Sequence, residues 1–273
     1  MARLTLERVS FWYPATERPA LRDASLAVAP GEVVALVGNV GAGASTLLLV
    51  AADLAPRVVG GTIKGTVDFR GRGNPKGLPH GRGEGGRGIV LPTPWTQLSG
   101  MAFTVRDEVA FGPANLGWPR ERIAGAVDRA LGALGIDALA ARDPATLSGG
   151  ELQRVVIAGI VAMEPALVLL DEPTAELDPE GAGLVWRLVR ALAGDGCSVV
   201  VATSDLNALP EVAHRIVWME DGAVRRIGDP ALLAEKALCE AGLATTVADV
   251  WRTARLGAPY PLTVAQAEER WRQ

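Results

Sequence analysis

Four short apolar runs constrain the fold of this chain more than any other feature, because hydrophobic and polar residues do not alternate within them. A strand has this pattern when both of its faces are covered, as in a parallel sheet with helices on each side. Segments rich in Ala and Leu, with helical spacing, lie at residues 46–55, 119–134, 152–162 and 181–193. Strands that alternate with helices predict an α/β fold. The four runs are Val33–Val37, Ala166–Leu170, Ser198–Ala202 and Ile216–Met219.

Several segments outside these runs have other patterns. Leu4–Val9 and Thr62–Phe69 alternate, which predicts half-exposed antiparallel strands beside the core sheet. Asp221-Gly222 lies between two apolar stretches and predicts a hairpin turn. Residues 71–88 include eight glycines and predict a mobile surface loop, because such a stretch cannot offset its ordering entropy by burial. The arginines in and beside it, at positions 70, 72, 82 and 87, either contact phosphate or are simply solvated.

Composition excludes several classes of protein. The 273 residues carry a net charge of −4, which disfavours a general nucleic-acid binder. Cys197 and Cys239 are too few for a disulfide scaffold or a four-cysteine zinc site. The opening sequence MARLTLERVS has charges where a signal peptide needs an apolar core. Because Glu164-Pro165 interrupts the longest apolar stretch, Val155–Leu170, we also expect no membrane span and a soluble, cytoplasmic chain.

The run Val33–Val37 continues directly into a glycine-rich loop and then an apolar helix. Glycines let successive backbone N–H groups curl around an anion, and the start of the helix adds its dipole. The loop matches G-x-x-x-x-G-K-[ST] except that Ala44 occupies the lysine position, and Ser45 lies where a hydroxyl would bind Mg²⁺. On this match alone, a glycine-rich turn without a ligand is an equal alternative. The candidate phosphate-binding residues are Gly38, Asn39, Gly41, Gly43, Ala44, Ser45 and Thr46.

Two acids, Asp171 and Glu172, follow the run Ala166–Leu170. A carboxylate at the end of a buried strand beside a phosphate loop can hold the water shell of Mg²⁺, and the next one can orient or deprotonate a water molecule. A plain strand end is the alternative. It is disfavoured, because paired acids after five apolar residues are costly unless they are used.

A third motif, Ser148-Gly149-Gly150-Glu151, lies at the predicted start of a helix, 23 residues before Asp171. Serine is a favoured first residue of helices, and the exposed N–H groups that follow form a second anion-binding position. Alone, the motif would indicate only a helix cap. The order and spacing of the three motifs together indicate a site.

With these motifs the chain resembles the nucleotide-binding subunits of ABC transporters. Within them it is most similar to the ATPases of energy-coupling-factor (ECF) transporters, which power the uptake of vitamins and of cobalt or nickel ions. The narrower resemblance rests on VSFWYP at residues 9–14, VAFGPANLG at 109–117 and, more weakly, PLT at 261–263.

The resemblance implies a P-loop NTPase fold of the α/β class. Its parts are a mostly parallel core sheet, an N-terminal antiparallel β subdomain, an inserted helical subdomain and a short C-terminal helical extension. We expect an ABC ATPase domain at residues 1–230, with the helical subdomain inserted at about 102–150. Residues 231–273 would form the extension, which resembles a dimerisation element.

The resemblance also implies ATP and Mg²⁺ as cofactors, with Ser45 and Asp171 on the metal ion. Tyr13 matches the aromatic residue that stacks on adenine, although a packing role at a strand end is the alternative. Because the family's subunits dimerise head to tail, each ATP lies between the phosphate loop of one subunit and the signature of the other. Ser148, Gly149 and Gly150 match that signature, and Asp178 matches the aspartate of the D-loop.

Three positions depart from the family pattern. Ala44 replaces the phosphate-binding lysine, and Pro92 replaces the glutamine of the Q-loop. Ser204, which lies 33 residues past Asp171, replaces the switch histidine that contacts the γ-phosphate. We expect impaired hydrolysis at this chain's own phosphate loop even though Glu172 is present. An engineered lysine-to-alanine change would explain Ala44 but not the other two positions.

These departures suggest that the chain is the degenerate half of a heterodimer. The expected partners are a second ATPase subunit with an intact lysine, a transmembrane coupling subunit and a substrate-binding membrane subunit, without nucleic acid. The chain would lie peripherally on the cytoplasmic face of the cell membrane, with the surface around Pro92–Thr104 receiving a coupling helix. One alternative is a structural subunit that never hydrolyses ATP. Another is a soluble ABC protein of translation or DNA repair, which the single, uninterrupted cassette disfavours.

Overall fold

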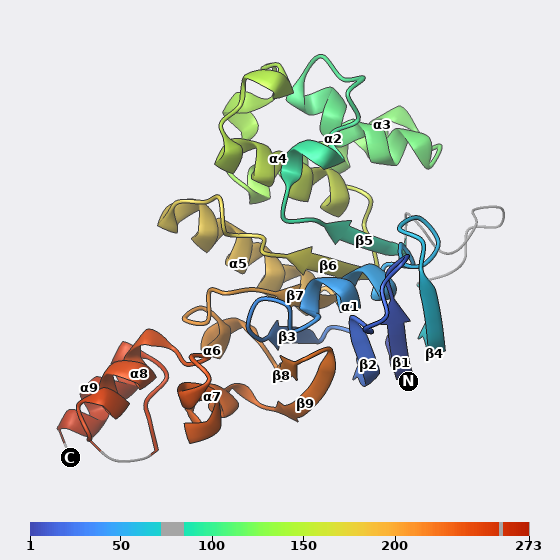
Figure 1. Cartoon of the computed structure of the whole chain (residues 1–273). Coiled ribbons are helices and arrows are strands. Elements are labelled where there is room, and N and C mark those ends of the chain that lie inside the picture. Colours follow the sequence, from blue (N-terminus) through green and yellow to red (C-terminus); the bar gives the residue numbers. More distant parts are fainter. Residues whose placement is uncertain (72–84, 257–258, 273) are drawn as a thin grey trace.

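The computed structural model describes residues 1–71, 85–256 and 259–272. Within these residues, one sheet has six strands in the order β5-β6-β7-β3-β8-β9 (Figure 1). Neighbours from β5 to β8 pair in parallel, and β9 pairs antiparallel with β8. The strands are β5 (Arg87–Val90), β6 (Leu167–Asp171), β7 (Ser198–Ala202), β3 (Val33–Val37), β8 (Arg215–Glu220) and β9 (Ala223–Gly228).

The central strands β3, β6 and β7 are buried at every residue, as their unbroken apolar runs predict. Alternate residues of β3 contribute to different cores: Val33 and Val37 pack on one side of the sheet, and Val34 and Leu36 on the other. The first core includes the helices α4 (Gly149–Val161) and α5 (Pro179–Gly194). The second includes α1 (Ala44–Ala51).

A three-stranded antiparallel sheet completes the second core, in the order β2-β1-β4. The alternating segments at residues 4–9 and 62–69 form β1 (Leu4–Trp12) and β4 (Thr62–Phe69), which pair antiparallel as predicted. Strand β2 (Leu21–Val28) was not predicted from the sequence. Its signal was present, because Leu21, Ala24, Leu26 and Val28 point inward while charged neighbours remain exposed.

A helical segment lies between β5 and β6 and occupies one end of the molecule (Figure 1). It comprises α2 (Val105–Asn115), α3 (Arg120–Ala133) and α4, with 3-10 turns at Pro94–Gln97, Asp137–Leu139 and Pro144–Thr146. Thr104 caps α2 from the position before it: its side chain accepts a hydrogen bond from the backbone N–H of Asp107, which satisfies a free donor of the first turn. Helix α4 starts in this segment and returns to the core sheet.

The C-terminal helices lie at the opposite end (Figure 1). The hairpin between β8 and β9 turns at Asp221 and Gly222, both with positive φ, so the predicted turn is confirmed. The chain ends with a 3-10 turn at Pro230–Ala234 and the helices α7 (Lys236–Glu240), α8 (Thr246–Thr253) and α9 (Val264–Trp271). The short helix α6 (Leu209–Val212) lies earlier, between β7 and β8. No helix in the described residues has the length and apolar character to cross a membrane.

Two predictions need correction. Residues 72–84 of the predicted glycine-rich loop lie outside the described residues, but its last residues, Arg87 and Gly88, belong to β5. Arg87 is not solvated: it donates to the carbonyl of Ala51 and lies over the ring of Phe69. Glycine at position 88 lets the strand pass beneath α4, since an added Cβ would lie 2.4 Å from a side-chain carbon of Ile160. Helix α1 also ends earlier than predicted, at Ala51.

Candidate nucleotide site

The phosphate loop connects the buried strand β3 to helix α1, as its sequence predicts. Gly41 and Gly43 have φ values of 85° and 99°, a conformation that side chains rarely adopt. Gly43 also passes close to another segment, since an added Cβ would lie 2.8 Å from the carbonyl oxygen of Ala20. No side chain caps the start of α1. The first N–H groups of this helix are therefore free to bind an anion.

Asp171 and Ser45 meet at the carboxyl end of the core sheet. The Ser45 hydroxyl donates to Oδ1 of Asp171 over 3.1 Å, although the residues are 126 positions apart in the sequence. Burial raises the pKa of Asp171; the Ser45 hydrogen bond opposes this rise, and the charge of Glu172 adds to it. A hydroxyl and a carboxylate are hard oxygen donors that suit Mg²⁺, with water and phosphate in the remaining positions. No cluster of three or more His, Cys, Asp or Glu residues that could hold a metal occurs in the described residues.

Glu172 is held by contacts from the end of strand β7 and from Ser204, two residues beyond it. Its φ of 47° turns the chain sharply, and its backbone N–H donates to the carbonyl of Ala202 over 2.8 Å. Both the backbone N–H and the hydroxyl of Ser204 donate to Oε2 of Glu172, each over 3.1 Å. The serine at the switch-histidine position therefore binds the carboxylate of the expected catalytic base.

One cavity unites most of the predicted nucleotide-binding residues. Tyr13 lies in its wall: its hydroxyl is 3.1 Å from Oγ1 of Thr46, and the ring of Phe11 packs edge-on against it with centroids 5.0 Å apart. Asn39 also donates to the carbonyl of Ala241 over 3.4 Å, a contact that the sequence analysis did not predict. Of the predicted residues, the cavity is lined by Tyr13, Gly38, Asn39, Gly41, Gly43, Ala44, Ser45, Thr46, Asp171, Glu172 and Ser204.

The charges of this cavity are unusual for a phosphate site. Asp171 and Glu172 contribute two carboxylates, whereas no Lys, Arg or His is among the described residues that line it. Ala44 is partly buried and packs against the second core. Among the described lining residues, positive potential therefore comes from the backbone N–H groups of the loop and the start of α1.

Ser148, Gly149 and Gly150 do not line this cavity; they form the start of α4. The backbone N–H and the hydroxyl of Ser148 donate to Oε2 of Glu151 over 2.8 and 2.9 Å, and the hydroxyl accepts from the N–H of Glu151. This reciprocal pair is a capping box. The S-x-x-E pattern in the sequence could have predicted this capping box. Only the capping role of Ser148 was predicted, and that of Glu151 was not.

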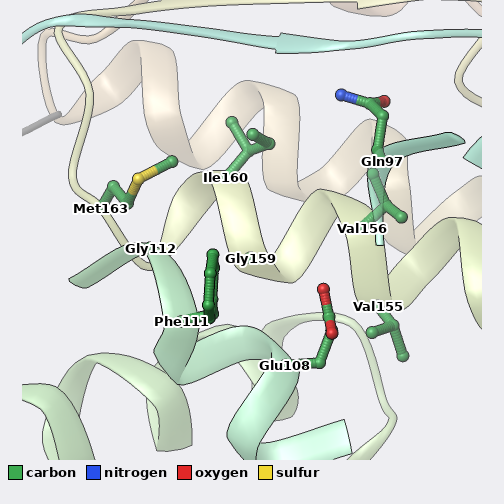
Figure 2. Close-up of a pocket in the computed structure, with 9 residues that line it drawn as sticks. All are labelled: Gln97, Glu108, Phe111, Gly112, Val155, Val156, Gly159, Ile160 and Met163. Carbon is green, nitrogen blue, oxygen red and sulfur yellow. The ribbon is translucent and has the colours of Figure 1, made fainter. Parts of the chain in front are cut away.

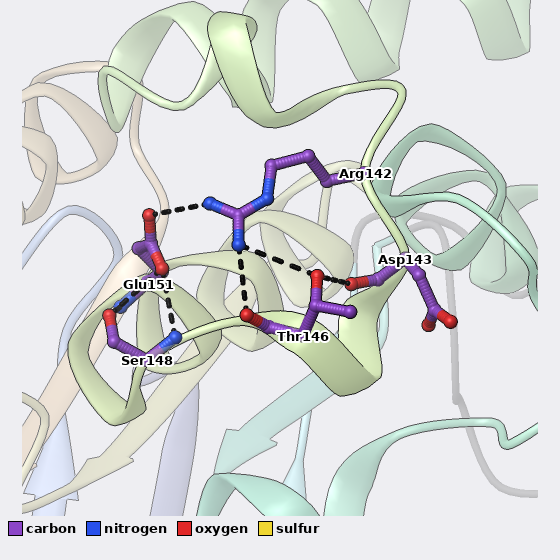
Figure 3. A network of polar contacts seen from close by, with 5 residues as sticks. All are labelled: Arg142, Asp143, Thr146, Ser148 and Glu151. Carbon is purple, nitrogen blue, oxygen red and sulfur yellow. Dashed lines mark hydrogen bonds and ion pairs between the residues drawn. The ribbon is translucent and has the colours of Figure 1, made fainter.

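Arg142 braces this helix start from the preceding turn, as Figure 3 shows. Its guanidinium lies 3.2 Å from Oε1 of Glu151 and donates to the carbonyl of Thr146 over 2.8 Å. The backbone N–H of Ser148, then its hydroxyl, hold the pKa of Glu151 below its ordinary value; partial burial opposes them, and Arg142 adds a smaller lowering. The tip of α4 is thus ordered by its own contacts.

Asp178 caps helix α5 from the position before it, and its carboxylate accepts from the backbone N–H of Gly181 over 2.7 Å. The segment before it packs against the tip of α4. A Cβ at Gly150 would lie 2.9 Å from the carbonyl oxygen of Glu176, and one at Gly149 would lie 3.2 Å from its carboxylate. The glycines therefore permit close contact between the predicted signature and the predicted D-loop.

Pro92 follows β5 and does not line the cavity. The nearby Gln97 is held at the end of that strand. Its Oε1 accepts from the N–H of Leu91 over 2.6 Å, and its Nε2 donates to the carbonyl of Ile89 over 2.9 Å. Gln97 was not predicted from the sequence as a site residue.

Comparison with known proteins identifies the family. A family model described as "ABC transporter" matches residues 21–175, more than half of the chain. The chain belongs to the ABC transporter family. Its α/β fold, with a mixed core sheet, an antiparallel N-terminal sheet and helical elements, is that of the P-loop ABC cassette.

Three relatives illustrate this membership. A "Putative ABC transporter ATP-binding protein" of Methanosarcina acetivorans is 38% identical over 84% of this chain, but the chain spans only 37% of that protein. The "Energy-coupling factor transporter ATP-binding protein EcfA1" of Lacticaseibacillus paracasei is 39% identical over 84% of this chain and 79% of its own length. The solved structure of cbiO1 from Clostridium perfringens, part of the ABC transporter complex cbiONQ, has a TM-score of 0.69 and 30% identity, covering 88% of this chain and 93% of that chain.

Proposed function

We propose that the chain is the ATP-binding subunit of an ECF-type ABC importer and the degenerate half of a heterodimer of ATPases. Relatives named as energy-coupling-factor ATP-binding proteins, from L. paracasei and other organisms, support the first part. In this proposal residues 1–230 are the ATPase domain, and residues 231–273 contribute to dimerisation. The importer takes up a vitamin or a transition-metal ion, and another subunit selects it.

One observation carries the second part: the two halves of the catalytic machinery on this chain are unequally preserved. The tip of α4 has its serine, its glycines and a complete capping box. The nucleotide cavity has Ala44 in place of lysine, Ser204 bound to Glu172, and no cationic side chain among the described lining residues. In a head-to-tail dimer these two halves serve different ATP molecules.

The expected losses in affinity and in rate define what this chain's own nucleotide site can still do. A hydrogen bond to a charged group contributes about 1.5–3 kcal/mol, so the loss of the lysine weakens nucleotide binding about 10- to 150-fold. The backbone N–H groups, Ser45 and Tyr13 still favour occupancy at millimolar ATP. Each missing transition-state contact slows hydrolysis by about 10²–10³. Such losses are not additive within one site, so the conclusion is that turnover here is severely impaired.

The other half completes the partner's site. Ser148, Gly149 and Gly150 present a hydroxyl and backbone N–H groups to the γ-phosphate held by the partner, which supplies its own lysine, glutamine, glutamate and histidine. Asp178 lies at the same dimer interface. Mg-ATP on this chain's own loop, with Mg²⁺ on Ser45 and Asp171, exchanges slowly and stabilises the dimer.

A groove in the helical segment is the proposed docking site of the membrane subunit (Figure 2). Apolar side chains of α2 and α4 form much of it, and the polar side chains of Glu108 and Gln97 also line it. Trp95, Met101 and Phe103 are exposed nearby, with exposed fractions of 52%, 73% and 86%. These large apolar side chains around the predicted docking surface favour a peripheral position at the cytoplasmic face of the membrane. The groove is lined by Gln97, Glu108, Phe111, Gly112, Val155, Val156, Gly159, Ile160 and Met163.

Reconstitution with the partner ATPase and the membrane subunits tests the proposal. The chain alone should have negligible ATPase activity, and the assembled complex should hydrolyse ATP. Ser148→Arg should abolish that activity by filling the partner's site, whereas Glu172→Gln should change it little. Ala191→Arg, which adds the same charge at an exposed position of α5, is the matched control.

Three outcomes would contradict the proposal in different ways. Robust turnover by the isolated chain would exclude a degenerate site. Activity that survives Ser148→Arg would favour the alternative of a structural subunit that never takes part in hydrolysis. Loss of activity with Glu172→Gln equal to that with Ser148→Arg would show that both sites hydrolyse ATP.

A further inference from the structure

A second cavity adjoins the phosphate loop on its outer side. Ala20 and Gly41 line both this cavity and the nucleotide cavity, so the two share a wall. The segment that joins β1 to β2 forms one side of it, and the β8–β9 turn forms another. Its lining residues are Arg18, Pro19, Ala20, Arg22, Gly41, Asp221 and Gly222.

The two arginines in this cavity differ in their contacts. Arg22 is already engaged: its Nε donates to the carbonyl of Asp221 over 2.6 Å, and its guanidinium lies 3.7 Å from the carboxylate of the same residue. Arg18 is exposed and has neither a hydrogen bond nor an ion pair within the part of the chain that the structure describes. Among the described residues that line this cavity, Arg18 is the cation that has no partner.

The described side chains of the nucleotide cavity supply no such charge. Its two carboxylates repel the phosphates of ATP, and the lysine that would offset them is absent. Ala20 lies in the wall of that cavity, and Arg18 is two residues away, at most about 7 Å along an extended chain. A long arginine side chain from this position can reach the opening, and its planar guanidinium matches phosphate oxygens in two-point contacts.

We propose that Arg18 binds the phosphate groups of the nucleotide on this chain's own phosphate loop and replaces the charge that Ala44 does not supply. This inference rests on the proposed function, in which that loop holds ATP. It places the phosphate-binding cation of the degenerate site on the β1–β2 segment. The site then retains nucleotide without recovering the lysine contact at the γ-phosphate.

Equilibrium binding of Mg-ATP and of adenosine to the full chain tests the proposal. Arg18→Ala should weaken Mg-ATP binding about tenfold at low salt, the effect of one exposed charge-assisted contact. It should leave adenosine binding unchanged, because adenosine has no phosphate. Arg22→Ala is the matched control and should alter Mg-ATP binding less than about twofold, since Arg22 is held by Asp221. Arg18→Lys should retain most of the affinity.

The Ala44→Lys background gives a second, independent readout. With the lysine restored, Arg18→Ala should weaken Mg-ATP binding by less than about threefold, because the two cations then share one role. If Arg18→Ala weakens the binding of Mg-ATP and adenosine equally, or leaves the Mg-ATP affinity unchanged, Arg18 does not bind the phosphates. Either result would leave the proposed function itself intact. If the wild-type chain binds Mg-ATP no more tightly than adenosine, the loop does not hold phosphate, and the proposed function fails first.

Discussion

Two helix starts in this molecule face phosphate in the proposed dimer, and they are built differently. The start of α4 is satisfied by its own side chains: Ser148 and Glu151 cap each other, and Arg142 braces them. The start of α1 has no side-chain cap and begins with Gly43 and Ala44. The first is therefore ordered before any ligand arrives, whereas the second depends on an anion to satisfy its N–H groups.

The comparison explains how a cassette can lose one function and keep the other. Ala44 and Ser204 line the pocket that depends on the ligand, Pro92 lies outside it, and none of the three contributes to the capping box of α4. A defect in one composite site therefore need not spread to the other. Substitutions at the start of α4 should therefore affect ATPase activity of the complex, and those at the start of α1 should affect nucleotide binding to this chain, by different amounts.

The largest effect is expected at Gly150. Gly150→Val places a side chain against the carbonyl of Glu176, which a Cβ would approach to 2.9 Å, so the tip of α4 must shift. ATPase activity of the reconstituted complex should fall about 10²- to 10³-fold, since the backbone N–H groups at the tip no longer meet the γ-phosphate. Binding of Mg-ATP to this chain's own loop should be unchanged. Steady-state hydrolysis and equilibrium binding measure the two effects.

Gly194→Val is the matched control, because an added Cβ at the end of α5 meets no atom within 4 Å. The control should retain full activity in the complex. If Gly150→Val also leaves the activity intact, the tip of α4 does not act at the partner's nucleotide. If it instead weakens nucleotide binding to this chain, the two helix starts are coupled rather than independent.

Much of the core sheet and of the phosphate site could be predicted from the sequence. Unbroken apolar runs predicted β3, β6 and β7, because burial on both faces leaves no other pattern. The family resemblance placed Ser45 and Asp171 on one Mg²⁺ ion, and the structure brings the two side chains within hydrogen-bond distance. Local motifs of this kind need little knowledge of tertiary structure.

Contacts between distant segments were not predictable in the same way. The hydrogen bonds from Ser204 to Glu172 and from Asn39 to Ala241 depend on how loops pack, for which a single sequence gives no spacing rule. Arg87 was expected in a solvated loop because its glycine-rich surroundings concealed a short strand. Arg18 was not predicted as a site residue, because its proposed role depends on the cavity that it lines, which is visible only in the structure.

A smaller effect, of opposite sign, is expected at the start of α1. Ala44→Lys should tighten Mg-ATP binding to the isolated chain about 10- to 100-fold by adding a charge-assisted contact to phosphate. Hydrolysis by the isolated chain should remain negligible, because Pro92 and Ser204 are still in place. Isothermal titration and single-turnover hydrolysis separate binding from chemistry.

Ala44→Met supplies a side chain of similar length without the charge and serves as the control. It should leave the affinity unchanged or weaken it. Equal tightening by methionine and lysine would show that packing, not charge, limits binding in this pocket. Rapid turnover by Ala44→Lys alone would mean that the other two positions are compatible with hydrolysis.

The smallest effect tests whether the start of α4 is ordered by its own charges. Contacts from Ser148 lower the pKa of Glu151 below its ordinary value of 4.5, so the stability that this carboxylate contributes is present above that pH and is lost as the pH falls through the lowered pKa. Glu151→Gln retains an acceptor but not the charge, and should cost about 0.5–1 kcal/mol at pH 7. Thermal unfolding should show a midpoint about 1–3 °C lower.

The difference between wild type and Glu151→Gln should shrink as the pH is lowered below 4.5, because the wild-type carboxyl then becomes neutral as well. Glu180→Gln, in the first turn of α5, is a suitable control, since the carboxylate of Asp178 caps that helix instead. A midpoint difference that is equally large at pH 3 and pH 7 would mean that the contacts of Glu151 act through shape rather than charge. The start of α4 would then owe its order to the packing of Gly150 against Glu176, and the difference from α1 would be one of packing rather than of charge.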